Sequence, residues 1–175
     1  MIEEEIGNEL RRAGGGATLA TAESCTGGLV SHRLTNAPGC SDYYKGGVVA
    51  YANEAKEKVL GVAGETLREK GAVSAECAVE MARGVRGLFK SDIGVATTGI
   101  AGPSGGTPEK PVGLVFIAVA TRDFADYEKH FFHGDRETNK REAAEAALGM
   151  LKKNILKIKT GTKGLVAQKG RAAGF

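Results

Sequence analysis

A chain of 175 residues, 42% hydrophobic and 26% charged, is long enough to bury a core without disulfides or metals. Its formal net charge of +3 is too small for the dense basic surface of a nucleic-acid-binding protein, and three cysteines without a CxxC pair argue against a disulfide framework. There is no charged-then-apolar leader and no apolar run of membrane-spanning length, so we expect a cytoplasmic protein with neither nucleic-acid nor membrane partners.

The first third of the chain predicts helices and strands in alternation. Apolar residues at helical spacing, short β-branched runs and glycine or proline breaks mark the boundaries. In chain order we expect a helix at 2–13, a strand at 17–22, a helix that begins at a Thr26 cap and stops before Pro38, a strand at 43–52, and a helix capped by Asn53 that ends at Gly61.

The rest of the chain predicts three more strands and three more helical segments. We expect a helical turn at 65–70, a helix capped by Ser74, strands at 92–99, 112–121 and 126–134, and a long helix from about Glu137 to Ile158. The strand at 112–121 reads as buried on both faces, and the one at 126–134 as nearer the sheet edge. This order predicts an α/β fold, a three-layer α/β/α sandwich with a mixed β-sheet.

The last sixteen residues, 160–175, are basic and glycine-rich and show no helical or strand periodicity. We therefore expect one domain at 1–159 and a loosely ordered tail. The alanine-rich helix before the tail suits either the core or a self-association face, so a homo-oligomer is left open.

The segment TAESCTGGLVSHRL, residues 21–34, brings three candidate nucleophiles together as Ser24, Cys25 and Thr26. It follows a strand and leads into a helix, where backbone N–H groups of Thr26, Gly27 and Gly28 can bind an anion or an oxyanion. A hydroxyl cap followed by a glycine turn explains the same residues, and the segment alone favours neither reading. Cys25 is expected to be a small buried filler.

A second candidate segment, AYANEAK, contains Tyr51 and Lys56. With Asn53 as cap, Lys56 falls at the third helical position, where the helix dipole disfavours an ammonium by about 0.3–1 kcal/mol. One pKa unit is about 1.4 kcal/mol, so a lysine acting as a base near pH 7 needs burial or a second cation as well. On this segment alone, a surface lysine beside Glu54 and Glu57 is the favoured reading.

A third candidate is the glycine-rich loop that follows the strand at 92–99. Such loops at strand ends are where α/β proteins bind ligands, and this one suits a phosphate or a carboxylate. It lacks the GK[ST] of a P-loop, which argues against a nucleoside triphosphate with magnesium. The expected binding residues are Thr98, Gly99, Gly102, Ser104 and Gly105, with Arg136 and Arg141 at the head of the last helix as phosphate ligands.

No cofactor or metal is expected. His32, His130 and His133 are scattered and form no metal-binding motif.

In combination, AESCTGG, YANEAK, GAVS, TTGIAGPSGG with KPVG, and GDR resemble the C-terminal domain family of the competence/damage-inducible protein CinA, from about Glu3 to Leu156. Each motif is weak alone, but their shared order is specific. The chain looks like a stand-alone form of that domain. The family includes nicotinamide-nucleotide amidohydrolases.

The resemblance implies hydrolysis of the carboxamide of nicotinamide mononucleotide, giving nicotinic acid mononucleotide and ammonia. It implies Ser24 as nucleophile, Tyr51 and Lys56 as the residues that activate it, Thr98 beside the substrate, and Arg136 or Arg141 as the family's arginine. Serine–lysine pairs are a known variant of nucleophilic amide hydrolysis. Two alternatives remain: a non-catalytic nucleotide-binding or interaction module, and hydrolysis of another pyridine or purine ribotide.

Overall fold

The computed structural model describes residues 1–13 and 15–171, with side chains up to Lys157. At its centre lies a five-stranded sheet of order β2-β1-β3-β4-β5. β1 is parallel to both β2 and β3, and β4 and β5 are added antiparallel, so the sheet is mixed, as predicted. The strands are β1 (Leu19–Glu23), β2 (Tyr44–Val49), β3 (Ile93–Gly99), β4 (Leu114–Ala120) and β5 (Ala125–Phe131).

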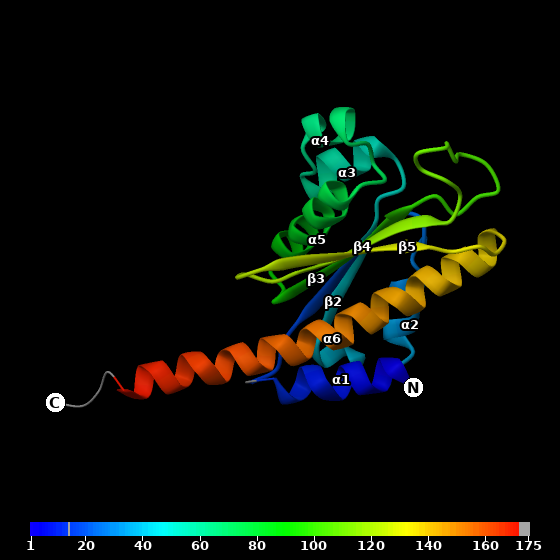
Figure 1. The fold of residues 1–175 in the computed structure, drawn as a ribbon. Helices are drawn as coiled ribbons and strands as arrows, with labels where there is room; N and C mark the ends of the chain where they lie inside the picture. The colour runs from blue at the N-terminus through cyan, green and yellow to red at the C-terminus, as the bar shows by residue number, and fades with distance from the viewer. Residues whose placement is uncertain (14, 172–175) are drawn as a thin grey trace.

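Helices cover both faces of the sheet and make the predicted three-layer sandwich (Figure 1). One face packs against α1 (Ile2–Arg12), α2 (Leu29–Thr35) and the long α6 (Arg136–Arg171). The other face packs against α5 (Ala75–Phe89), beside which lie α3 (Asn53–Leu60) and the short α4 (Gly64–Glu69). A 3₁₀ turn, Cys40–Asp42, precedes β2. The core is therefore divided by the sheet into two apolar layers.

The helix α5 approaches α3 and β3 closely because the residues at the two points of contact are glycines. A Cβ built on Gly84 would lie 1.8 Å from the carbonyl oxygen of Leu60, and one built on Gly94 of β3 would lie 2.0 Å from that of Ala82. Both distances are far below van der Waals contact. The close approach fixes where α3 ends relative to the sheet.

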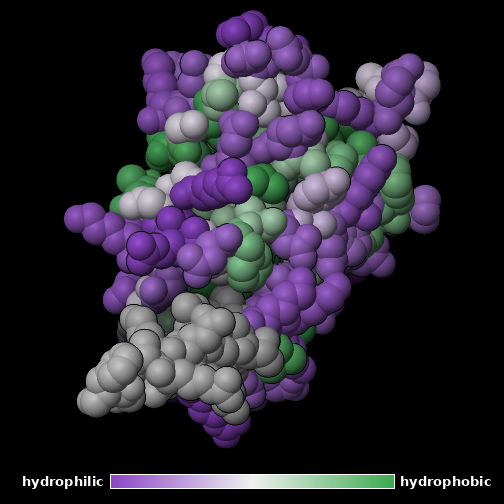
Figure 2. All heavy atoms as spheres, turned by 60° about the vertical axis from the view of Figure 1, so that its left-hand side comes forward, coloured by the Kyte–Doolittle hydropathy of each residue, from purple (hydrophilic) through white to green (hydrophobic). Residues whose placement is uncertain are grey.

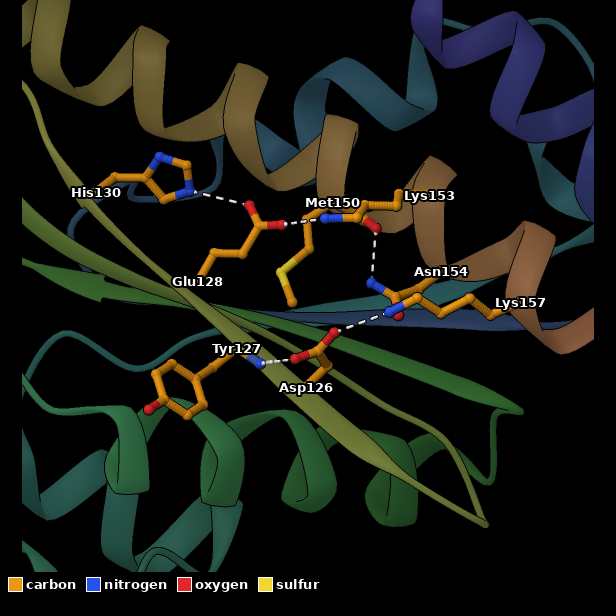
Figure 3. A network of polar contacts seen from close by, with 8 residues as sticks. All are labelled: Asp126, Tyr127, Glu128, His130, Met150, Lys153, Asn154 and Lys157. Carbon is orange, nitrogen blue, oxygen red and sulfur yellow. Dashed lines mark hydrogen bonds and ion pairs between the residues drawn. The ribbon is translucent and has the colours of Figure 1, made fainter.

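The position of β5 at the sheet edge confirms the prediction for that strand. Figure 3 shows Asp126 and Glu128 of β5 facing α6, where Lys157 and Lys153 contact them at 3.0 and 3.2 Å. These ion pairs are partly exposed and contribute at most about 1 kcal/mol each. Their position ties α6 to the outermost strand.

The last helix is longer than predicted. Its end was expected near Ile158, but its backbone continues to Arg171, so residues 160–171 are part of α6. Adding turns to an existing helix avoids the cost of nucleation, which is why weak local periodicity does not end it. Figure 1 shows this end of α6 projecting beyond the sheet. The remaining tail residues lie outside the described part of the chain.

The surface suits the charge content of the chain. The face drawn in Figure 2 is mostly hydrophilic, with hydrophobic residues in smaller separate areas. Within the described residues, no helix combines the length and the apolarity needed to cross a membrane.

Two glycines of α5, one packed against α3 and one exposed, offer a matched test of the packing. Gly84→Ala should destabilise the protein by about 2 kcal/mol or more, because its methyl group overlaps the backbone of Leu60. Gly87→Ala meets nothing within 4 Å and should be neutral or stabilising by up to about 1 kcal/mol. Urea unfolding of the two variants measures this, and equal stabilities would contradict the packing described.

Candidate active site

Ser24 follows directly on the last residue of the central parallel strand β1. Its N–H group donates to the carbonyl oxygen of Thr97 on β3 at 2.9 Å, which continues the strand pairing one residue beyond β1. The side chain is 7% exposed. The serine hydroxyl therefore lies at the carboxyl end of the parallel strands, the usual location of ligands in such sheets.

Lys56 brings a buried amine to this serine. It lies in α3, is 1% exposed, and its Nζ lies 3.0 Å from Ser24 Oγ. The same nitrogen donates to the backbone carbonyl oxygens of Ala50 at 3.0 Å and Tyr51 at 3.1 Å. The part of the chain that the structure describes contains no carboxylate paired with Lys56, so neutral oxygens are its acceptors.

Burial lowers the pKa of Lys56 from its ordinary value, because removal from water disfavours the ammonium. Thiolates at Cys77 and Cys25 would raise it. However, burial also raises the pKa of Cys25 to about 12 and that of Cys77 to about 11, so both are neutral thiols near pH 7. Those opposing charges are absent at that pH, and the lowering by burial prevails.

The helix that carries Lys56 begins differently from the prediction. Asn53 was expected as N-cap, but it is the first helical residue, and Ala52 caps α3 without a side-chain hydrogen bond. Lys56 is thus one position further from the helix start than expected. Its lowered pKa comes from burial, which the local sequence did not reveal.

The phenol of Tyr51 makes no hydrogen bond to Ser24 or Lys56 among the described residues. It is 58% exposed, and its hydroxyl accepts a 2.7 Å hydrogen bond from Arg136. The same guanidinium donates to the carbonyl oxygen of Gly102 at 2.6 Å. Tyr51 therefore reaches Lys56 through its backbone carbonyl, and its side chain joins Arg136 to the rim of the site. Transfer of the Ser24 proton to Lys56 through the Tyr51 phenol does not match this arrangement.

The other two candidate nucleophiles are placed in structural roles. The Cys25 side chain is 5% exposed within the core, and its raised pKa keeps it a thiol, which agrees with the filler interpretation. Thr26 was predicted to cap α2, but it does not. The N-cap of α2 is Gly28, in a left-handed conformation with φ 99°.

The carboxylate of Glu23 takes over the capping. Its two oxygens accept from the N–H groups of Gly28, Val30 and Ser31 at 3.0, 3.1 and 2.8 Å. They also accept from the hydroxyls of Thr26 at 2.6 Å and Ser31 at 2.7 Å. A residue before the turn thus satisfies the donors that a hydroxyl cap would otherwise satisfy.

These bonds determine which N–H groups are open to a ligand. Gly27 N–H donates to Ser24 O at 3.1 Å, and Gly28 N–H is bonded to Glu23. The N–H groups of both glycines that were expected to face an oxyanion are therefore already hydrogen-bonded within the protein. The N–H groups of Cys25 and Thr26 donate to no oxygen of another described residue, and both lie near the sulfur of Cys25.

Residues in and beside the glycine-rich loop after β3, predicted to bind a ligand, make contacts within the protein instead. The hydroxyl of Thr98 is buried and donates to the carbonyl oxygen of Ala72 at 2.7 Å, so it holds the segment before α5. Gly99 is the last residue of β3, and Gly102 meets Arg136 through its carbonyl group. Ser104 and Gly105 are exposed in the loop.

A cavity of about 590 Å³ opens between residues 26–29, which follow Ser24 in the chain, and the start of α6. Its lining includes three cationic side chains, Arg136, Lys140 and Arg141, against one carboxylate, Glu137. The predicted residues that it brings together are Thr26, Gly27, Gly28, Arg136 and Arg141; it adds Leu29, His32, Glu137 and Lys140. Of the expected loop residues, Thr98, Gly99, Gly102, Ser104 and Gly105 do not line it.

Two residues of the α6 start had been missed. Lys140 lies one helical turn after Arg136, and this spacing on one helix face was the available signal. Asn139 is buried; its amide donates to Ala101 O at 3.0 Å and its oxygen accepts from Gly134 N–H at 2.9 Å. It braces the glycine-rich loop against the helix that carries Arg136. No group of side chains in the described residues has the composition of a metal site.

The comparisons with known proteins agree with this fold. A CinA-like protein of Salinibacter ruber is 53% identical over 147 residues, 84% of this chain and 35% of the relative. One of Chloroherpeton thalassium is 52% identical over 157 residues, 86% of this chain and 36% of the relative. The chain thus spans about a third of the length of the curated relatives it matches.

Solved structures and a family model match most of this chain. A CinA superfamily protein from Klebsiella pneumoniae superposes with a TM-score of 0.84 at 35% identity, covering 89% of this chain and 96% of the other. The competence/damage-inducible protein CihA from Agrobacterium tumefaciens gives 0.80 at 39% identity, covering 86% and 94%. The family model described as CinA C-terminal domain matches residues 1–155. The chain therefore belongs to the CinA C-terminal domain family.

Proposed function

We propose that this chain hydrolyses the carboxamide of nicotinamide mononucleotide through a serine nucleophile, giving nicotinic acid mononucleotide and ammonia. The observation that supports it is the 3.0 Å contact between Ser24 Oγ and a buried lysine amine without a carboxylate partner in the described residues. An unpaired, desolvated amine is a base rather than a fixed cation. A helix cap alone would need no such lysine.

In the first half of the reaction, neutral Lys56 Nζ accepts the hydroxyl proton as Ser24 Oγ attacks the carboxamide carbon. The resulting ammonium then gives a proton to the leaving nitrogen, which departs as ammonia and leaves an ester on Ser24. In the second half, Lys56 takes a proton from water, which attacks the ester carbonyl. The acid product leaves, and the serine regains its proton. Each step uses one base within hydrogen-bond distance of the serine.

The developing oxyanion needs donors that are not already bonded. The N–H groups of Cys25 and Thr26 meet this condition, whereas those of Gly27 and Gly28 are engaged. Two aligned backbone donors are the usual composition of an oxyanion hole, and the loss of one typically costs about 100-fold or more in rate. We therefore assign the oxyanion to Cys25 and Thr26.

The cavity beside the turn supplies a place for the nucleotide. Its volume of about 590 Å³ is in the usual range for a small-molecule site. Arg136, Lys140 and Arg141 give it an excess of positive charge, which suits a phosphate. The lining of the cavity ends at Thr26 and does not include Ser24, so the proposal requires the carboxamide end of the substrate to extend past Thr26 to the serine.

Replacing the nucleophile tests the reaction directly. Wild-type protein should release ammonia from nicotinamide mononucleotide, and Ser24→Ala should lower the rate by about 1,000-fold or more, because the covalent route is lost. Cys25→Ala should keep most of the rate, since the thiol is buried filler and the backbone N–H group remains. Release by Ser24→Ala at the wild-type rate would contradict the serine mechanism. No release by wild type would favour a non-catalytic binding module.

The pH dependence tests the role of Lys56. The reactive form is the neutral amine, so kcat/KM should rise about tenfold per pH unit and level off at the pKa of Lys56. Because burial lowers that pKa, the plateau should begin well below the value of about 10.4 of an ordinary lysine. Lys56→Arg remains charged throughout and should be inactive. A wild-type profile that still rises at the ordinary lysine pKa would rule out the lowered pKa.

The same lowered pKa predicts a stability effect. Between the folded and the unfolded pKa of Lys56 the unfolded chain binds more protons, so stability increases with pH across that window. The penalty is complete below the folded pKa and absent above the unfolded one. Urea unfolding of Lys56→Met across the same pH range should lack this rise. An identical rise in the variant would assign it to other groups.

A further inference from the structure

Glu23 is a buried carboxylate for which the proposed reaction has no use. It is the last residue of β1 and 1% exposed, and no ion pair with a lysine, arginine or histidine is present among the described residues. Five donors meet its two oxygens: three N–H groups and two hydroxyls. A buried carboxylate is unfavourable unless it is fully hydrogen-bonded, and here it is.

All five donors belong to the Thr26–Ser31 turn, which begins two residues after Ser24. A single Ser or Thr side chain at the helix start is the usual cap and needs no buried charge. Here Gly28 caps α2 without a side chain, and the carboxylate binds the turn from the strand below. The fold alone does not call for this arrangement.

The hydrogen bonds return to Ser24 through a second path. Thr26 Oγ1, which donates to Glu23, also lies 2.7 Å from Thr97 Oγ1, and the backbone carbonyl of Thr97 accepts from Ser24 N–H at 2.9 Å. Thr26 and Thr97 are both buried. The backbone on each side of Ser24 is therefore tied into one closed set of bonds between β1, β3 and the turn.

The network continues on the other side of the carboxylate. Ser31 Oγ lies 2.8 Å from Thr21 Oγ1, which in turn lies 2.8 Å from the hydroxyl of Tyr44 on β2. The turn is thus anchored to all three parallel strands through side chains. Such over-determination is expected where a group must be held in one position.

We propose that Glu23 is a positioning residue for the nucleophile: its carboxylate fixes the Thr26–Ser31 turn so that Ser24 Oγ stays at Lys56 and the N–H groups of Cys25 and Thr26 stay open. Only the turnover assay for this inference depends on the proposed function. The reactivity of Ser24 itself can be measured without that substrate.

Glu23→Gln is the first test. One carboxylate oxygen becomes an NH₂ group, which cannot accept, so the hydroxyl and N–H donors on one side of the turn lose their acceptor. A displacement of about 1 Å at a reacting group can cost about 100-fold in rate. We expect kcat for nicotinamide mononucleotide to fall about 100-fold with KM within about threefold, because the cationic residues of α6 are untouched.

A matched control separates positioning from loss of stability. Ile155→Ala removes buried apolar volume from the core, about four helical turns beyond Arg141 on α6, and should destabilise the protein without touching α3 or the turn. Assayed below the melting temperature of both variants, Ile155→Ala should keep the wild-type kcat and KM, whereas Glu23→Gln should not. Equal losses in the two variants would reduce Glu23 to a structural role and overturn the proposal.

Thr97 provides a test should Glu23→Gln fail to fold. Thr97→Val keeps the volume and removes the hydroxyl that joins the network to β3, so kcat should fall about tenfold. Thr97→Ser restores the hydroxyl and should recover most of that loss. Equal rates for the valine and serine variants would contradict a network that acts through hydrogen bonds.

Labelling of Ser24 by diisopropyl fluorophosphate, followed by peptide mass spectrometry, distinguishes the two proposals. Wild type labelled at Ser24 and slow labelling of Glu23→Gln support the positioning role even if nicotinamide mononucleotide is not hydrolysed. Labelling of Glu23→Gln at the wild-type rate overturns it even if that substrate is hydrolysed. Absence of labelling and of turnover in wild type overturns both.

Discussion

The site depends on a lysine amine held out of water beside a serine hydroxyl. A charged ammonium in this position would have three neutral oxygens as partners, two of them backbone carbonyls, and no carboxylate among the described residues. Desolvation is costly for the charged form and nearly free for the neutral one. The protein thus obtains a base by withholding a counterion.

The sheet topology makes this contact possible. β1 and β2 are parallel neighbours, so the residues that follow them emerge at the same edge: Ser24 after β1, and the segment carrying Ala50 and Tyr51 after β2. The chain then turns into α3, which returns Lys56 to the serine. Close packing of α5 at Gly84, against the last residue of α3, keeps that helix in place. A movement of α3 would expose the amine to water.

The serine side of the site is built with opposite chemistry. The carboxylate of Glu23 is fully hydrogen-bonded by five donors, whereas Lys56 has only neutral oxygens as partners among the described residues. In the chain the two residues lie on either side of the nucleophile. One fixes geometry and the other supplies a proton acceptor. The cationic side chains of α6 line the cavity, and Glu23 does not. These cations can therefore bind the anionic end of a ligand without forming an ion pair with the buried carboxylate.

Local sequence patterns predicted the layers, the mixed sheet and the edge position of β5, since these follow from periodicity and element order. They could not predict that Lys56 is buried, because burial arises from the packing of α3 against residues far away in the chain; beside Glu54 and Glu57 it resembled a surface lysine. Thr26 looked like a cap because cap rules consider the helix start, not a carboxylate in the preceding strand. Only the order of several distant motifs pointed to Ser24 and Lys56 together.

The protonation state of Lys56 tests the central claim most directly. The ¹³Cε resonance of Lys56, identified by its absence in Lys56→Met, can be followed by NMR across a pH titration of the substrate-free protein. The account predicts that this lysine titrates below the exposed lysines of the same molecule. Titration together with the exposed lysines, or above them, would contradict a base created by burial.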